Sequence, residues 1–260
     1  MKQQGDISVD IGDDHVAIVE IHRPPENYFD VDLIRAIADA FDELDADPRC
    51  RAILLASEGK HFCAGANFGS PRGLGDGDGG DPTLALYREA VRLFRSMTPV
   101  VAVVQGAAIG GGLGLACAAD FRVASPQARF AANFSRLGFH HGFGLSATLP
   151  EIVGTQHALD LLYTGRRING EEAARIGLVD RLVPAEALRD AAQGFAAEIA
   201  GSAPLAVRSI RATMRGHLAD AVQRAVEREA EEQARLRTTT DFAEGIRATA
   251  ERREPHFTGY

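Results

Sequence analysis

The chain has 260 residues, enough for one α/β domain with a sizeable core and an appended segment. Its 28 Lys and Arg residues against 36 Asp and Glu residues give a net charge of −8 without a basic run, which argues against nucleic acid and anionic membranes as partners. No apolar run approaches the roughly 20 residues of a membrane span, and the first residues match neither a secretory nor a transit peptide. Cys50, Cys63 and Cys117 are widely spaced, which favours reduced thiols and a cytoplasmic location.

The first 97 residues alternate between strand-like and helix-like patterns. In chain order they predict a hairpin (Ile7–Ile11 and Val16–Ile21), a helix (Val31–Asp47), a strand (Ala52–Ala56), a mobile loop rich in Gly and Asp (Ser70–Pro82) and a helix (Thr83–Met97). The last of these helices, with the loop before it, would suit a lid over a binding pocket.

The middle of the chain continues the alternation. It predicts a buried strand (Val100–Val104), a glycine turn, a helix (Leu113–Ala119), short strands (Phe121–Ala124 and Ala128–Ala132), helices (Leu145–Val153, His157–Tyr163 and Glu171–Ile176) and a strand-like segment (Gly177–Val183).

From Ala185 onward the pattern is helical only. The segment from Leu205 to Arg237 is highly charged but keeps apolar residues at helical spacing, so we expect one face of it to be packed. These residues are Leu205, Ile210, Met214, Leu218, Val222 and Val226. Asp241 with Glu244 three residues later resembles a capping box at the start of the final helix.

The glycine turn at Gly110, Gly111 and Gly112 is the first candidate site. Main-chain N–H groups at the start of the following helix lack intrahelical partners and could face a negative oxygen, although a packing role for the glycines is an equal alternative. A P-loop requires Lys and Ser or Thr after the glycines, and a dinucleotide fingerprint requires a glycine where Leu115 stands. An oxyanion hole for a carbonyl oxygen that becomes an enolate remains.

A second turn of small residues, Cys63 to Ala66, follows the strand at 52–56, and two such turns can direct one N–H each at the same oxygen. With this turn the chain resembles the crotonase superfamily, also called the enoyl-CoA hydratase/isomerase superfamily. The resemblance is carried by an Arg-Pro-x-x-Asn element (23–27), an F-x-A-G-x-D element (62–67, with Asn67 in place of Asp) and a G-x-x-x-G-G-G element (106–112). Single matching positions continue from Leu161 to Gly245.

The resemblance implies an α/β fold built as a spiral of ββα units. Residues 1–195 would form the core with the CoA-thioester site, and residues 196–260 a helical region that makes a homotrimer or a dimer of trimers. The substrate would be an acyl-CoA, with coenzyme A as part of the substrate and no other cofactor or metal. Residues expected to bind this substrate are Ala66, Asn67, Phe68, Gly110, Gly114, Phe134 and Phe257.

By the same resemblance, the N–H groups of Ala64 and Gly111 would stabilise a thioester enolate. The two glutamates that serve typical hydratases align with Gly114 and Phe134, neither of which can transfer a proton. Gly114 would instead open room for a ring or a branched acyl group.

His141 is the first replacement as general acid or base, because an unperturbed imidazole titrates near neutral pH, and His140 is the second. Tyr87 and Glu89 on the expected lid helix are further candidates. Three functions remain open: a hydratase or isomerase with an altered acid/base set, an enolate-linked C–C hydrolase, decarboxylase or lyase acting on a CoA ester or a β-diketone, and a non-catalytic acyl-CoA-binding protein.

Overall fold

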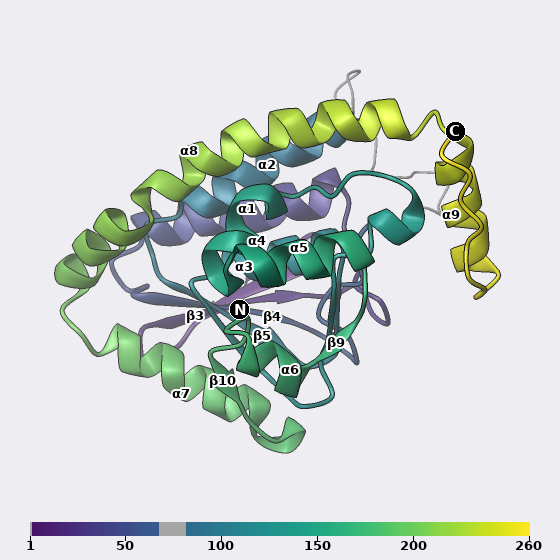
Figure 1. Ribbon diagram of the computed structural model, residues 1–260. Helices are drawn as coiled ribbons and strands as arrows, with labels where there is room; N and C mark the ends of the chain where they lie inside the picture. Colours follow the sequence, from purple (N-terminus) through teal and green to yellow (C-terminus); the bar gives the residue numbers. More distant parts are fainter. Residues whose placement is uncertain (1, 68–81) are drawn as a thin grey trace.

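The computed structural model describes residues 2–67 and 82–260 and has a central sheet enclosed by helices (Figure 1). Within these residues the larger sheet has the strand order β1-β2-β3-β4-β5-β7-β10. Its strands are β1 (Lys2–Gln4), β2 (Ile7–Ile11), β3 (Val16–Ile21), β4 (Ala52–Ser57), β5 (Val100–Val104), β7 (Phe121–Ala124) and β10 (Arg181–Leu182). The predicted hairpin and the strands at 52–56, 100–104 and 121–124 are confirmed.

The sheet from β3 to β10 is parallel, and its residues alternate between two apolar layers. On β4, Ile53 and Leu55 face one layer, whereas Ala52 and Leu54 face the other. Every residue of β4 is buried, as expected for a parallel strand covered on both faces. The strand therefore reads as a continuous apolar run rather than as an alternating pattern.

Helices cover both faces of this sheet (Figure 1). The helices are α1 (Val31–Ala46), α2 (Pro82–Arg95), α3 (Gly111–Ala118), α4 (Leu145–Val153), α5 (Thr155–Thr164), α6 (Gly170–Arg175), α7 (Leu188–Ala200), α8 (Pro204–Leu236) and α9 (Thr240–Ala250), with short 3₁₀ turns at Ser135–Leu137 and Ala185–Ala187. Helix α7 packs on one face, and α1, α2 and α3 pack on the other. The mixed α/β class is confirmed.

A smaller sheet positions the glycine turn. In the described part of the chain its strand order is β6-β8-β9, with β6 at Ala107–Ile109, β8 at Arg129–Ala131 and β9 at Ile168–Asn169. Strand β6 was not predicted from the sequence, because three residues of this composition carry no periodic signal. The strand places Ile109 directly before the glycine turn, so a second strand separates β5 from α3.

The strand-like segment at 177–183 is shorter than predicted, since only Arg181–Leu182 pairs with the sheet. The predicted loop at 70–82 lies outside the described residues except for Pro82, which begins α2. Within the described ranges, no helix combines the length and the apolar character that crossing a membrane requires.

The helical character after residue 185 is confirmed, but the packed face of α8 covers only part of its length. Leu218 and Val222 are buried, whereas Leu205, Ile210 and Met214 are 80%, 61% and 66% exposed. The expectation of one continuous packed face is therefore wrong for the first part of α8 in the isolated chain. The proposed division at residue 195 stays a prediction.

The predicted capping box at Asp241 and Glu244 is wrong. Thr239 caps α9 instead, accepting a hydrogen bond from the Phe242 N–H at 3.1 Å. The Asp241 carboxylate accepts hydrogen bonds from the N–H groups of Thr258 and Gly259. Asp241 therefore binds the C-terminal tail, which turns back along α9, and Glu244 binds the same tail.

Glu244 accepts a hydrogen bond from the His256 N–H at 2.9 Å and pairs with Arg253 at 2.6 Å. Its ion pairs and hydrogen bonds, with Arg253 first, lower the pKa of the Glu244 carboxyl. The tail is thus fastened to α9 by charge-assisted hydrogen bonds.

Candidate active site

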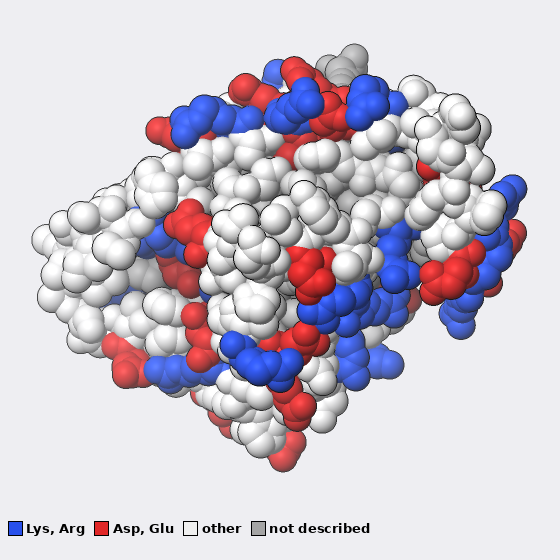
Figure 2. All heavy atoms as spheres, viewed as in Figure 1, with Lys and Arg blue, Asp and Glu red and all other residues white. Residues whose placement is uncertain are grey.

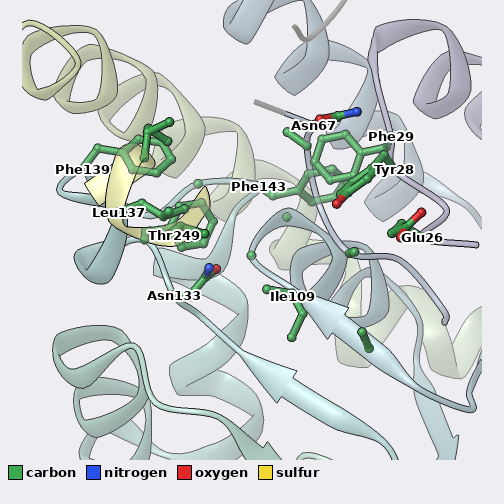
Figure 3. Close-up of a pocket in the computed structure, with 18 of the residues that line it drawn as sticks. Glu26, Tyr28, Phe29, Asn67, Ile109, Asn133, Leu137, Phe139, Phe143 and Thr249 are labelled. Atoms are coloured by element: carbon green, nitrogen blue, oxygen red, sulfur yellow. The ribbon is translucent and has the colours of Figure 1, made fainter. Parts of the chain in front are cut away.

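A cavity of about 620 Å³ lies where the loops after β3, β4 and β6 meet α2, α8 and α9. This volume is in the range of small-molecule and cofactor sites. Figure 3 shows Glu26 and Tyr28 on one side of the cavity, Leu137 and Phe139 on the other, and Phe143 between them. The wall is mainly apolar, with a few polar groups placed among aromatic rings.

Asn27 holds the first two of these loops together. Its side chain is fully buried and donates to the carbonyl oxygens of Glu58 at 2.8 Å and His61 at 2.6 Å. Its own amide oxygen accepts a hydrogen bond from the Arg23 N–H at 3.0 Å. The Arg-Pro-x-x-Asn element therefore acts structurally, because one side chain satisfies three main-chain groups.

The two turns of small residues are joined by main-chain hydrogen bonds. The Cys63 N–H donates to the Ala107 carbonyl at 2.9 Å, and the Ile109 N–H donates to the Cys63 carbonyl at 3.0 Å. An ideal Cβ on Gly112 would lie 2.1 Å from the Cys63 carbonyl oxygen. The glycine at 112 is thus required for packing, as the packing alternative expected.

Gly65 and Gly110 have positive φ angles of 91° and 59°, which suit glycine. An ideal Cβ on Gly65 would lie 2.8 Å from the Ile109 carbonyl oxygen and 3.8 Å from the Gly111 nitrogen. The two turns therefore meet beside the start of α3. Ala66 and Gly111 both line the cavity at this point.

Ala64 was predicted to supply one oxyanion donor, and this prediction is wrong. The Ala64 N–H donates to the Glu26 carbonyl at 2.9 Å, so it is already occupied. Among residues 2–67 and 82–260, the N–H groups of Ala66 and Gly111 have no protein acceptor. The available pair is therefore Ala66 with Gly111, because the bridge between Phe29 and Ala66 uses the neighbouring amides.

Aromatic side chains occupy the region where sequence reasoning placed open space. Phe134 lines the cavity as predicted, with its ring centroid 5.4 Å from that of Phe139. Gly114 does not open the cavity, because an ideal Cβ on it would lie 2.6 Å from Cβ of Phe143. The space that Gly114 provides is filled by Phe143, which also packs 5.5 Å from Phe29.

The two histidines lie beside the cavity without lining it. Their rings stack with centroids 4.1 Å apart, and Nε2 of His141 lies 2.8 Å from Oγ of Ser146. Burial, and secondly His140, lower the pKa of His141 to about 3. The fold therefore favours the uncharged form of His141, against the expectation that this imidazole titrates near neutral pH.

The other predicted residues are spread around the site. Asn67 and Gly110 line the cavity, and Phe68 lies outside the described residues. Phe257 lies away from this cavity, in a second hollow that Tyr260 also lines. Glu89 faces α1, where it pairs with Arg35 at 3.2 Å.

Glu26, Tyr28 and Asn133 also line the cavity, and sequence reasoning gave none of them a role in the site. Glu26 and Tyr28 flank Asn27 of the Arg-Pro-x-x-Asn element, and Asn133 precedes Phe134, so adjacency to the motifs was the available signal. Burial first, then the charge of Glu26, raise the pKa of the Tyr28 hydroxyl. Cys63 is fully buried, and burial raises the pKa of its thiol to about 12, so it is an unreactive thiol.

The family profile for enoyl-CoA hydratase/isomerase matches residues 12–260, which includes both turns and the whole cavity. The chain belongs to the enoyl-CoA hydratase/isomerase family. It is similar to a crotonyl-CoA hydratase of Syntrophomonas wolfei, with 34% identity over 248 residues that cover 94% of this chain and 95% of the relative.

Solved structures of the enoyl-CoA hydratase/isomerase family have the same fold. A family member from Pseudoalteromonas atlantica superimposes with a TM-score of 0.86 at 31% identity, covering 97% of this chain and all of that one. An enoyl-CoA hydratase from Mycobacterium avium subsp. paratuberculosis gives 0.84 at 29% identity, covering 98% and 99% of the two chains. The crotonase-like fold predicted from the three motifs is confirmed.

The state of His141 can be measured directly. We expect its imidazole signals to stay constant in NMR spectra between about pH 8 and about pH 5, because its pKa in the folded chain is about 3. Since the unfolded residue titrates near about 6.5, the unfolded state binds more protons between these two values. The contribution of His141 to stability is therefore present above about pH 6.5 and decreases as the pH falls towards 3. The chain unfolded in urea is the control, and a midpoint near neutral pH in the folded protein would contradict the expectation.

Proposed function

We propose that this protein acts on an acyl-CoA thioester and stabilises its enolate between the N–H groups of Ala66 and Gly111. The observation that carries the proposal is the pair of unoccupied amides at one cavity wall, among residues 2–67 and 82–260. Gly111 is the first residue of α3, so the positive end of the helix dipole strengthens the attraction of its N–H for a negative oxygen. Amides held in this way stabilise developing negative charge without reorganising.

The rest of the cavity supports a CoA ester as the ligand. Arg129 and Arg167 line it and are exposed, although the whole chain is acidic. Basic side chains gather on the surface between α6 and α9 (Figure 2). Cations at this position suit the phosphates of coenzyme A, whereas the aromatic wall suits an acyl group. Coenzyme A enters as part of the substrate, and a cytoplasmic location remains part of this proposal.

The proposed acid/base chemistry has to work without the two glutamates of typical hydratases, because positions 114 and 134 hold Gly and Phe. Gly114 lies under Phe143, and Phe134 presents an apolar ring to the cavity. Among the described lining residues Glu26 is the only carboxylate, which makes it the proposed proton acceptor in place of His141. Enolate-linked C–C cleavage is the second candidate, because it uses the same amide pair and does not require two glutamates to add water across a double bond. A protein that only binds acyl-CoA is the remaining alternative.

A panel of CoA esters tests the proposed function. Purified protein is incubated with crotonyl-CoA, a linear 3-oxoacyl-CoA and a cyclic 3-oxoacyl-CoA, whose ring ketone is β to the thioester, and the products are followed by absorbance and mass spectrometry. We expect saturable turnover of at least one ester and its loss in Glu26→Gln. Addition of water without shortening indicates hydration, and a shortened or ring-opened acyl group indicates C–C cleavage. Absence of turnover with every ester would contradict the enzymatic proposal and leave acyl-CoA binding alone.

The amide pair is tested by changing Gly65, the glycine of the turn at 63–66 that faces the end of β6. In Gly65→Ala the new Cβ would approach the Ile109 carbonyl to 2.8 Å and move Ala66 relative to Gly111. We expect kcat for the ester identified above to fall by about 10² to 10³, the usual cost of losing one oxyanion donor. Gly194→Ala is the matched control, because nothing lies within 4 Å of its added Cβ on α7. Equal kcat values for the two variants would argue against the pair.

We also propose that the protein assembles as a homotrimer or a dimer of trimers through the first part of α8. Leu205, Ile210 and Met214 expose apolar side chains there, and few charged residues cover the same end of the molecule in Figure 2. Contiguous exposed apolar surface of this kind marks an interface.

Light scattering tests the assembly. We expect a mass of three or six chains for the natural sequence and of one chain for Ile210→Glu/Met214→Glu, because two charges on this face oppose its burial. Ala185→Glu adds a charge at an exposed residue outside α8 and serves as the control. A single-chain mass for the natural sequence would contradict the proposal.

A further inference from the structure

Tyr87 of α2 occupies a position that only a glycine neighbour permits. The side chain is 4% exposed and lines the cavity. An ideal Cβ on Gly142 would lie 1.7 Å from the Tyr87 hydroxyl oxygen and 2.7 Å from its Cζ. The absence of a side chain at Gly142, directly after the two histidines, therefore leaves room for this hydroxyl at the cavity wall.

The hydroxyl of Tyr87 keeps its proton. Burial first, and then the charge of Glu229, raise its pKa, against the charge of Arg237 and hydrogen bonds from the Phe143 N–H and the Gln233 side chain. Both hydrogen-bonding groups face the phenol oxygen as donors. Because the partners of this oxygen are donors, they leave its O–H free to donate to a ligand in the cavity that Tyr87 lines.

Helix α8 fixes this arrangement from the other side. The Gln233 amide donates to the His140 carbonyl at 2.9 Å and accepts from Arg237 at 3.2 Å. Glu229 is fully buried and accepts hydrogen bonds from the N–H groups of Gly144 at 2.8 Å and Ser146 at 2.9 Å. The carboxylate thereby caps α4, and the turn at Gly142 is held against Tyr87.

Only one residue separates this hydroxyl from the amide pair. Phe143 donates its N–H towards Tyr87, and its ring lies 3.5 Å from an ideal Cβ on Gly111. Gln233 and Arg237 also line the cavity, and the apolar part of its wall is formed by Leu86, Phe134, Leu137 and Phe139. A buried O–H donor is unfavourable without an acceptor, and a carbonyl oxygen of the bound acyl group can supply one.

We propose that Tyr87 donates a hydrogen bond to a carbonyl oxygen of the acyl group, so that the site selects oxoacyl-CoA esters over saturated ones. This inference rests on the proposed function and adds the substrate class to it. Tyr87 thus determines specificity through an oxygen beyond the thioester, while the thioester oxygen occupies the amide pair. A site built around such a donor disfavours the analogue that lacks the oxygen, because the buried hydroxyl is then left unpaired.

Equilibrium binding of three esters of equal chain length tests the proposal. Calorimetry compares hexanoyl-CoA, 3-oxohexanoyl-CoA and 5-oxohexanoyl-CoA, and mass spectrometry checks that each recovered ester is intact or identifies its product. We expect one oxo ester to bind the natural protein about five- to tenfold more tightly than hexanoyl-CoA, which corresponds to one neutral hydrogen bond. Tyr87→Phe should remove that preference and leave the affinity for hexanoyl-CoA within about twofold.

Tyr163→Phe is the matched control, since Tyr163 is 74% exposed on α5 and outside the cavity. It should retain the preference for the oxo ester. Equal affinity of the natural protein for all three esters, or a preference that survives in Tyr87→Phe, would overturn the role of Tyr87. Equal weakening of all three esters in Tyr87→Phe would show a structural role only and would also overturn it. If no ester binds more tightly than coenzyme A itself, the proposed function fails instead.

Discussion

The bridge that Cys63 makes with β6 is the constraint on which the site depends. Its N–H and carbonyl are both used by the segment from Ala107 to Ile109, so the two small-residue turns cannot move apart. Gly112 must then lie against the Cys63 carbonyl, and Gly65 against that of Ile109. Backbone-to-backbone contact this close excludes side chains, and it leaves main-chain N–H groups as the polar groups of that wall.

The cavity combines this polar wall with aromatic surfaces. Phe29 and Phe143 pack over Gly111, and Phe134 and Phe139 extend the apolar surface away from it. Water is a poor competitor in such a site, so a hydrogen bond from a fixed amide acts more strongly than it would at the surface. Outside the cavity, burial beside a second imidazole lowers the pKa of His141, because both disfavour its charged form.

Helix α8 links the cavity to the periphery of the molecule. Near its C-terminal end, Glu229 and Gln233 hold the turn that contains Gly142, and Arg237 lines the cavity. Near its N-terminal end, Ile210 and Met214 are exposed. A single rigid helix therefore joins a buried polar network to an unpaired apolar face. Such a network restricts the turn to one arrangement, because every donor and acceptor in it depends on its neighbours.

The sequence by itself determined the family, the parallel core strands and the glycine turn, because continuous apolar runs and glycine spacing are local signals. It also placed Phe134 at the cavity, through its position in the motifs. Only the tertiary structure decided that the Ala64 N–H is hydrogen-bonded to the Glu26 carbonyl. It also decided that Phe143 fills the space over Gly114 and that His141 lies outside the cavity. It likewise brought the Gln233 side chain to the hydroxyl of Tyr87, although 146 positions separate the two residues. Hydrogen-bond partners and burial depend on loops that meet across the fold, and no local pattern encodes those contacts.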